Sequence, residues 1–308
     1  MAKRRKIHTA KDDSKAAVII TALLVAAIIA FFILSKGKEN HQEAHKEKII
    51  SSNEPVDRYI PNENIKPVEP QPGPISPKPF EGLSGSGGKI AIIIDDWGQS
   101  TANCKYLKEI PEPLAVSILP GLRHTKDVAN CAGLNHKLTM LHLPLEALHN
   151  YDFYPPNYII KTTMNPDLVA KIVDEDLAQL PSIEGVNNHM GSKATENRPL
   201  MKIIFKKIKK KGLFFVDSMT ASHTVCAALA DEMGLSFGKR DVFLDNINTR
   251  EAITKQMLIL AQRARRHGYA VAIGHDRHLT MQVLKDEIPL LENQGFQFVS
   301  IKELLKTK

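Results

Sequence analysis

Residues 89–308 are predicted to fold as an α/β barrel, closed or partly open, with seven or eight strands. One observation is a short β-branched run, Ile90–Ile94, that ends at two adjacent carboxylates. A second is that apolar runs of strand length alternate with segments of helical period to the end of the chain. A third is that no sequence period indicates a repeat protein. Together these patterns favour a parallel sheet covered by helices.

The run Ile90–Ile94 is typical of a strand buried on both faces. Ligands of parallel α/β folds collect beyond the carboxyl ends of the strands, an edge that we call the rim. Asp95 and Asp96 follow the first strand at this rim. One aspartate there is as readily explained as the cap of a helix or turn. Two adjacent carboxylates raise each other's pKa unless a cation or a hydrogen-bond donor offsets their repulsion, and a metal is the simplest such group.

Three segments of different composition precede the barrel. Residues 1–15 carry six lysines and arginines against two aspartates, and residues 16–34 are apolar except for Thr21. A helix over 16–34 spans about 28 Å, close to the thickness of a bilayer, and no small-residue cleavage site follows it. We therefore expect a cytoplasmic tail, a retained single-pass helix in the inner (cytoplasmic) membrane, and a body in the periplasm or outside the cell. Residues 35–88 are proline-rich and predict a flexible linker.

Charge and cysteine content argue against two classes of site. The formal charge of +7 comes from 41 Lys and Arg against 34 Asp and Glu, and it is not concentrated as in nucleic-acid-binding proteins. We expect no nucleic-acid partner. Cys104, Cys131 and Cys226 have neither CxxC nor zinc-knuckle spacing. One disulfide with one free thiol fits an oxidising compartment, and three buried thiols are the favoured interpretation.

The other elements follow in order along the chain. One helical stripe begins behind Asn165-Pro166, and a second runs from Leu200 to Ile208 with a lysine run on its other face, typical of a solvated helix surface. Two more helices are expected at about 249–267 and 279–293. The expected strands are 89–95, 114–119, 138–143, 184–189, 213–217, 241–245, 269–274 and 296–299.

Nearly every expected strand delivers a polar side chain to the rim. Singly, these residues have structural explanations: His142 as a core histidine, His189 as a turn residue, and Asp217 as a helix cap. As a set they are costly to bury unless they bind something. Imidazole with carboxylate suits zinc or a similar divalent ion, with one position left for water. The rim candidates are Asp95, Asp96, Trp97, His142, Glu146, His189, Asp217, Asp241, Asp245 and His275.

Five motifs at these positions carry a family resemblance: Ile-Ile-Ile-Asp-Asp, His-Leu-Pro-Leu-Glu, Asn-Asn-His-Met-Gly-Ser, Phe-Val-Asp-Ser and Ala-Ile-Gly-His. Over essentially all of 89–308 the chain resembles the divergent polysaccharide deacetylase family, distant relatives of the chitin and peptidoglycan deacetylases. The resemblance implies a distorted (β/α) barrel that holds a divalent metal. It also implies that Asp95 matches the catalytic base, Asp96 a metal-binding aspartate, and His275 the histidine that protonates the leaving amine.

The sequence departs from the better-known deacetylases at two points. Their His-x-x-x-His metal motif is His142-x-x-x-Glu146 here, and Arg198-Pro199 is typical of a helix start instead of their arginine-and-proline motif. From the strand order we infer that His189 supplies the missing imidazole.

The leading hypothesis is a membrane-anchored, metal-dependent hydrolase that deacetylates an N-acetylated envelope polysaccharide. Asp96, His142 and His189 would hold the metal, with zinc favoured, while Asp95 acts as base and His275 as acid. Supporting or sugar-contacting candidates are Glu146, Asp217, Asp241 and Asp245, and Trp97 could stack on a sugar ring. The alternative is an inactive glycan-binding or scaffold protein with the same fold, and a third reading is phosphoester hydrolysis. A binder needs no base beside its metal, so Asp95 next to Asp96 favours the enzyme.

Overall fold

A computed structural model describes residues 87–149 and 159–306 of the chain. Within them, nine strands form one sheet in which all paired strands are parallel. The strands are β1 (Lys89–Trp97), β2 (Leu114–Ile118), β3 (Leu138–Leu145), β4 (Gly185–Met190), β5 (Phe214–Asp217), β6 (Phe237–Lys239), β7 (Val242–Phe243), β8 (Tyr269–His275) and β9 (Gln297–Phe298). The helices are α2 (Cys104–Glu109), α3 (Thr125–Leu134), α4 (Pro166–Gln179), η2 (Ala194–Glu196), α5 (Arg198–Lys210), α6 (Cys226–Met233), α7 (Arg250–His267), α8 (His278–Glu292) and α9 (Ile301–Lys306).

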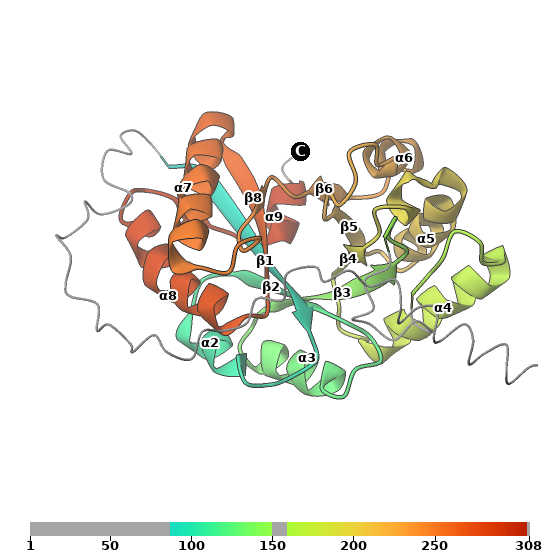
Figure 1. Ribbon diagram of the computed structural model, residues 1–308, viewed down its shortest axis with the longest axis horizontal. Helices are drawn as coiled ribbons and strands as arrows, with labels where there is room; N and C mark the ends of the chain where they lie inside the picture. The colour runs from blue at the N-terminus through green and yellow to red at the C-terminus, as the bar shows by residue number, and fades with distance from the viewer. Residues whose placement is uncertain (1–86, 150–158, 307–308) are drawn as a thin grey trace, which may run out of the picture. The chain divides into compact units, whose positions relative to one another are not determined.

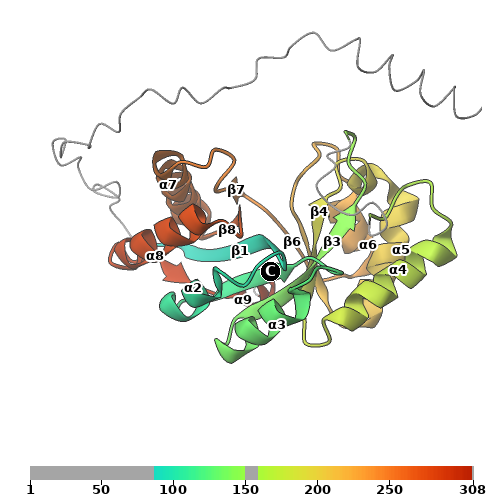
Figure 2. The ribbon, with the colours of Figure 1, turned by 60° about the horizontal axis from the view of Figure 1, so that its bottom comes forward.

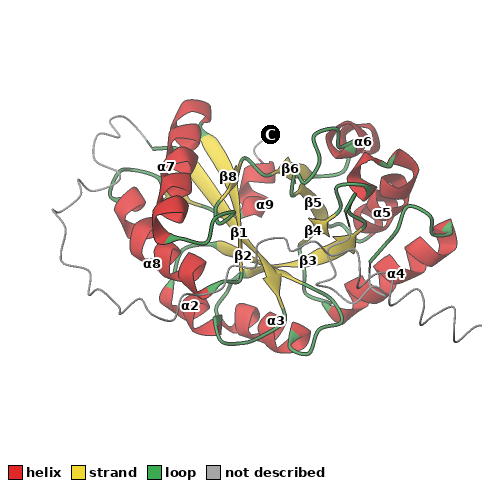
Figure 3. Ribbon diagram, in the orientation of Figure 1, coloured by secondary structure: helices red, strands yellow, loops and turns green. Residues whose placement is uncertain are grey.

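The strands form a barrel that is open along one seam. Their order is β6-β5-β4-β3-β2-β1-β8-β7, with β9 paired to β1 off this path. Among the eight strands of the path, those adjacent in the sequence are adjacent in the sheet except β6 and β7, which are its two edges. The strands curl into an arc with most helices on its outer side (Figures 1 and 3). Arg240 spans the seam: its Nε donates to the carbonyl of Ser218 at 2.7 Å, and its guanidinium lies 4.9 Å from the ring centre of Phe243. The predicted barrel is confirmed in its open form.

Two hydrophobic cores follow from the alternation of side chains along the strands. Ile90, Ile92 and Ile94 belong to the outer core, between the sheet and the helices, whereas Ala91 and Ile93 belong to an inner core. Figure 2 shows α2, α3 and α4 following one another along the outside of the sheet. The short helix α9 instead lies within the arc (Figure 1) and contributes to the inner core. The inner core is therefore closed by the end of the described chain.

The long helices begin where the sequence predicts. Asn165 and Asn197 accept hydrogen bonds from the backbone N–H groups of Asp167 and Leu200, and a proline follows each cap in the first turn. Arg198-Pro199 is thus a helix start, as expected. The helix α7 is capped by Thr249 at its start and followed by Gly268, whose φ of 82° suits glycine.

Several elements differ from the prediction. The helices α2, α3 and α6 were not expected because they are short or have few buried apolar residues, and the three-residue strand β6 was also missed. The eighth expected strand corresponds to β9, which pairs only with the start of β1 and is not part of the continuous order of the other eight strands. All three cysteines are free, but only Cys226 is buried, so the expectation of three buried thiols is wrong.

No helix in 87–149 and 159–306 is long and apolar enough to cross a membrane, and the expected span at 16–34 lies outside the described residues.

Candidate metal centre

Asp95 and Asp96 both approach the same histidine because β1 is irregular at its end. In an ideal strand, successive side chains point to opposite faces. The pairing of β1 with β2 shifts register between Ile94 and Trp97, and Asp96 has a φ of 64°, a left-handed conformation uncommon outside glycine. As a result, carboxylate oxygens of Asp95 and Asp96 lie 3.6 and 3.2 Å from Nε2 of His142. The bulge lets both carboxylates serve one site.

Three side chains from three strands converge at this point of the rim. Asp96 is the penultimate residue of β1, His142 lies in β3 and His189 lies in β4. Oδ1 of Asp96 lies 3.2 Å from Nε2 of His142 and 2.9 Å from Nδ1 of His189, and the two ring nitrogens are 3.2 Å apart. His142 is 2% exposed, whereas the side chains of Asp96 and His189 are 35% and 18% exposed. The three ligand atoms therefore form a small triangle with one side open to solvent.

The triangle has the dimensions of a metal site. Zinc binds nitrogen and oxygen ligands at about 2.0–2.1 Å, and the edge of such a tetrahedron is about 3.3 Å. The observed edges of 2.9–3.2 Å are close to this length. Oδ1 of Asp96 is buried, and no hydrogen bond of good geometry reaches it among the described residues. The donor set of one carboxylate and two imidazoles is thus consistent with a divalent metal and leaves one position for water.

The charges within the triangle favour an ionised Asp96 carboxylate with a positive charge beside it. Burial would raise the pKa of the Asp96 carboxyl, but the adjacent His142 and His189 rings reverse this and hold its pKa far below the usual range. Burial would lower the pKa of His142, but the Asp95 and Asp96 carboxylates outweigh it and raise that pKa. Without a metal, the carboxylates therefore attract a proton to His142. A bound cation would take over this neutralising role.

Asn187 in β4 orients two of these groups and was not recognised from the sequence. Its Oδ1 accepts hydrogen bonds from Oγ of Ser117 at 2.5 Å and from Nδ1 of His142 at 2.9 Å, while its Nδ2 donates to Oδ1 of Asp95 at 2.8 Å. The bond from Nδ1 fixes the His142 tautomer that presents the Nε2 lone pair to the triangle. Two adjacent asparagines within a β-strand were the available signal, because a buried amide requires partners.

Asp95 lies beside the triangle in a drier environment. It is 2% exposed, and the Asn187 amide is its hydrogen-bond donor. Burial raises the pKa of its carboxyl, with His142 and Asn187 opposing the shift and Asp96 adding to it. A carboxylate with a raised pKa is a stronger proton acceptor than an exposed one, which suits a general base.

His275 forms a hydrogen-bonded pair with Asp245 and faces Asp96 with its other ring nitrogen. Nδ1 of His275 lies 2.8 Å from Oδ1 of the fully buried Asp245, and its Nε2 lies 3.8 Å from Oδ2 of Asp96. The Asp245 carboxylate also accepts a hydrogen bond from Thr280 at 2.7 Å. Burial would lower the pKa of His275, but Asp245 and then Asp96 raise it. His275 is therefore held with Nε2 facing the site.

The structure does not bring four other candidates to the triangle. Glu146 accepts from Thr162 and Lys193, Asp217 accepts from Met219 and Thr224, and Asp241 accepts from the backbone of Val271. These bonds close loops or extend the sheet. Trp97 has no exposed surface and packs in the outer core, so the expectation that it stacks on a sugar ring is wrong for this conformation.

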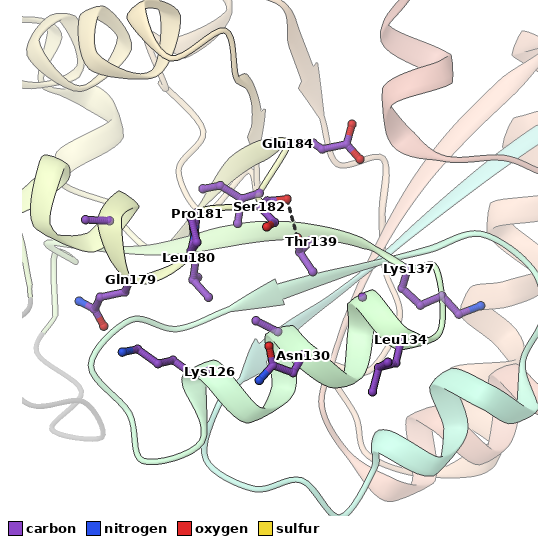
Figure 4. Close-up of a pocket in the computed structure, with 14 residues that line it drawn as sticks. Lys126, Asn130, Leu134, Lys137, Thr139, Gln179, Leu180, Pro181, Ser182 and Glu184 are labelled. Atoms are coloured by element: carbon purple, nitrogen blue, oxygen red, sulfur yellow. Dashed lines mark hydrogen bonds between the residues drawn. The ribbon is translucent and has the colours of Figure 1, made fainter.

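A groove of about 920 Å³ lies elsewhere, between α3 and the segment that joins α4 to β4 (Figure 4). Its lining includes Lys126, Leu134, Gln179 and Thr139, which donates to the carbonyl of Ser182 at 3.2 Å. None of its lining residues belongs to the triangle or to the Asp245–His275 pair. The groove is therefore separate from the candidate metal centre, and its volume does not make it the reaction site.

The model of the divergent polysaccharide deacetylase family matches residues 92–305, which include the triangle, Asp95 and the Asp245–His275 pair. The chain belongs to this family. It is 31% identical over 201 residues to the uncharacterized protein YibQ of Escherichia coli K12, covering 65% of this chain and 62% of YibQ. It is 29% identical over 206 residues to an uncharacterized protein of Haemophilus influenzae, covering 67% of this chain and 73% of that protein.

A solved structure confirms the fold of this divergent deacetylase domain. The uncharacterized protein ATU2773 of Agrobacterium tumefaciens C58 superposes with a TM-score of 0.68, covering 74% of this chain and 95% of that one. The two sequences are 18% identical, so the likeness concerns the fold alone.

Proposed function

We propose that the barrel domain is a metal-dependent hydrolase that removes acetyl groups from an N-acetylated envelope polysaccharide. The observation that carries this proposal is the convergence at one rim of a three-ligand triangle, a buried carboxylate beside it and an imidazole–carboxylate pair opposite. Membership of the family supports a polysaccharide substrate. Zinc is the metal that the donor set favours.

A metal held by Asp96, His142 and His189 would lower the pKa of a bound water and polarise the acetyl carbonyl. Asp95 would accept the proton that this water loses as it attacks the carbonyl carbon. Its raised pKa suits this step, and the Asn187 amide holds one of its oxygens so that the other faces His142. The base is thereby fixed in place before substrate arrives.

His275 would donate a proton to the nitrogen as the carbon–nitrogen bond breaks, so that acetate and a free amine leave. The Asp245 carboxylate accepts from Nδ1 and leaves Nε2 to carry the transferred proton toward the site. The hydrogen bond from Thr280 holds Asp245 in turn. Every step is thus assigned to a residue whose orientation is set by a buried neighbour.

We further propose that residues 16–34 anchor the protein in the inner membrane and place the barrel on the envelope side. The apolar span without a cleavage site supports this placement. Amino-terminal sequencing of membrane-extracted protein should show residues before 16, and a mature chain that begins after residue 35 would refute the retained anchor.

The activity is tested by acetate release from N-acetylated chitin oligomers and from peptidoglycan with metal-loaded protein. If Asp95 is the base, Asp95→Asn should bind metal and glycan normally yet lose about 10²–10⁴-fold in rate. Asp176→Asn is the matched control, because it makes the same change at a buried carboxylate in α4, outside the triangle.

Other results of this assay separate the alternatives. A wild-type domain that binds glycan and metal but releases no acetate would support the scaffold interpretation. Release that survives Asp95→Asn would keep the hydrolase and remove Asp95 from its mechanism. Turnover of a phosphoester, without acetate release, would favour the third interpretation.

A further inference from the structure

Two of the three cysteines lie against each other although they are distant in sequence. Cys104 is the first residue of α2, and Cys131 lies in α3, against which α2 packs. Sγ of Cys131 is 3.7 Å from the carbonyl oxygen of Cys104, which places the two residues in contact. This contact joins residues 27 positions apart. The sheet and the outer core hold both helices, so the contact is a property of the folded domain.

The third cysteine differs in both burial and surroundings. Cys226 has no exposed surface and its sulfur faces the carbonyl of Thr195 at 4.0 Å. Cys104 and Cys131 are each only half-buried at the edge of the outer core. A reagent in solution can therefore approach the pair, whereas Cys226 is shielded. The three thiols thus divide into an accessible pair and a single buried residue.

We propose that Cys104 and Cys131 form a disulfide when the domain meets a thiol-oxidising partner that itself carries a disulfide. The Cys131 thiolate attacks the donor disulfide, forms a mixed disulfide and releases one donor thiol. The Cys104 thiolate then attacks the sulfur of Cys131, which forms the intramolecular bond and releases the second donor thiol. Two protein thiols are oxidised and one donor disulfide is reduced to two thiols, so atoms and electrons balance. Burial and the adjacent Cys131 raise the pKa of Cys104 to about 12, which disfavours Cys104 as the first nucleophile.

The crosslink would fix the segment that leaves the metal centre. Asn103 immediately precedes Cys104, and its Nδ2 donates to Oδ1 of Asp276 at 2.7 Å. The backbone N–H of Asp276 donates to the carbonyl of Asp95 at 2.9 Å. A covalent link from α2 to α3 thus ties the loop after β1 to the outer layer of the barrel. This inference is independent of the proposed hydrolysis, because it depends only on the packing of α2 and α3.

The test uses the full chain, equilibrated with defined ratios of reduced and oxidised glutathione and then alkylated under denaturing conditions for mass spectrometry. We expect two of the three thiols to disappear without a glutathione adduct, and proteolysis to yield one linked peptide pair containing Cys104 and Cys131. The oxidised protein should also melt at a temperature about 5 °C or more above the reduced one.

Two variants make the test specific. Cys226→Ser should oxidise like the wild type, whereas Cys131→Ser should form no internal disulfide and show no gain in melting temperature on oxidation. If Cys131→Ser does not fold, Cys104→Ser and the wild-type peptide map give the same information. Three alkylated thiols at the most oxidising ratio, separate glutathione adducts on Cys104 and Cys131, or a link that includes Cys226 would each overturn the proposal.

Discussion

The inner core and the rim of the open barrel differ in chemistry although the same strands build both. In the inner core, α9 places Ile301 and Leu304 beside Ile93 and Met140. At the rim, the same strands end in carboxylates, imidazoles and a buried amide. Of the four described non-glycine residues with positive φ, three lie within two residues of a strand end at this rim: Asp96, Met190 and Met219.

This difference separates stability from function within one domain. Burying apolar surface stabilises the fold, whereas burying ionisable groups and holding strained backbone cost free energy. We therefore expect substitutions in the inner core to lower stability and leave the site chemistry intact. Substitutions at the rim should instead impair metal binding or catalysis and leave stability intact. Four predictions test this division, beginning with the largest expected effect.

Leu304→Ala should lower the free energy of unfolding by about 2–4 kcal/mol, because it leaves a cavity where α9 closes the inner core. Chemical denaturation measures this loss. Metal bound per folded molecule should stay at the wild-type level, and a fall in metal binding that matches the fall in stability would break the proposed division.

Asn187→Ala should weaken metal binding by about 10–100-fold, because His142 loses the acceptor that fixes its tautomer and Asp95 loses its donor. Competition with a chromophoric chelator gives the affinity. The matched control is Asn188→Ala, since Asn188 bonds to the backbone of Met190 and Ser218 and not to the triangle. Equal losses in both variants would contradict a positioning role for Asn187.

The sequence predicted much of this division and missed specific parts of it. The β-branched run before Asp95 and the capped helices α4, α5 and α7 have strong local signals, so their positions were predictable. The helix α3 buries only Thr125, Val128 and Ala132, which leaves too weak an apolar stripe to recognise. The bulge at Asp96 has no strong local signal, because the left-handed region, here a φ of 64°, is only a minority conformation for aspartate.

The same limit applies to individual site residues. Asp96, His142 and His189 were identified because three ligand-type side chains at strand ends are costly to bury without a ligand. The burial of Trp97 and the loop-closing bonds of Asp217 depend on which way each side chain turns after its strand ends. A sequence places a residue at the rim but does not give this direction.

Asp245→Asn should move the alkaline limb of the rate profile to lower pH. The Asp245 carboxylate raises the pKa of His275, and a general acid is active only below its pKa. Removing the charge lowers that pKa, so the protonated form is lost earlier as the pH rises. The measurement is the pH dependence of acetate release, and an alkaline limb that does not move would exclude His275 as the acid.

Glu287→Gln should have the smallest effect, on stability alone. Burial raises the pKa of Glu287 in α8 to about 7, and one of its carboxylate oxygens has no hydrogen-bond partner among the described residues. An acid with a raised folded-state pKa destabilises the fold as the pH rises from its unfolded value, 4.5, through about 7. The variant should match the wild type at pH 5 and exceed it by about 1–2 kcal/mol at pH 8, since solvent screens part of the cost. Denaturation at the two pH values measures this difference, and equal stabilities at pH 8 would contradict it.

The most direct test of the central claim, that Asp96, His142 and His189 hold a divalent metal, is the metal content of the purified full chain after zinc loading and dialysis. The wild type, Asp95→Asn and Asp176→Asn should each retain about one zinc per chain, because none of these changes removes a ligand. Asp96→Ala and His189→Ala should each retain far less, with far-ultraviolet circular dichroism near that of the wild type. Wild-type occupancy in both ligand variants, or no retained metal in the wild type, would contradict the account.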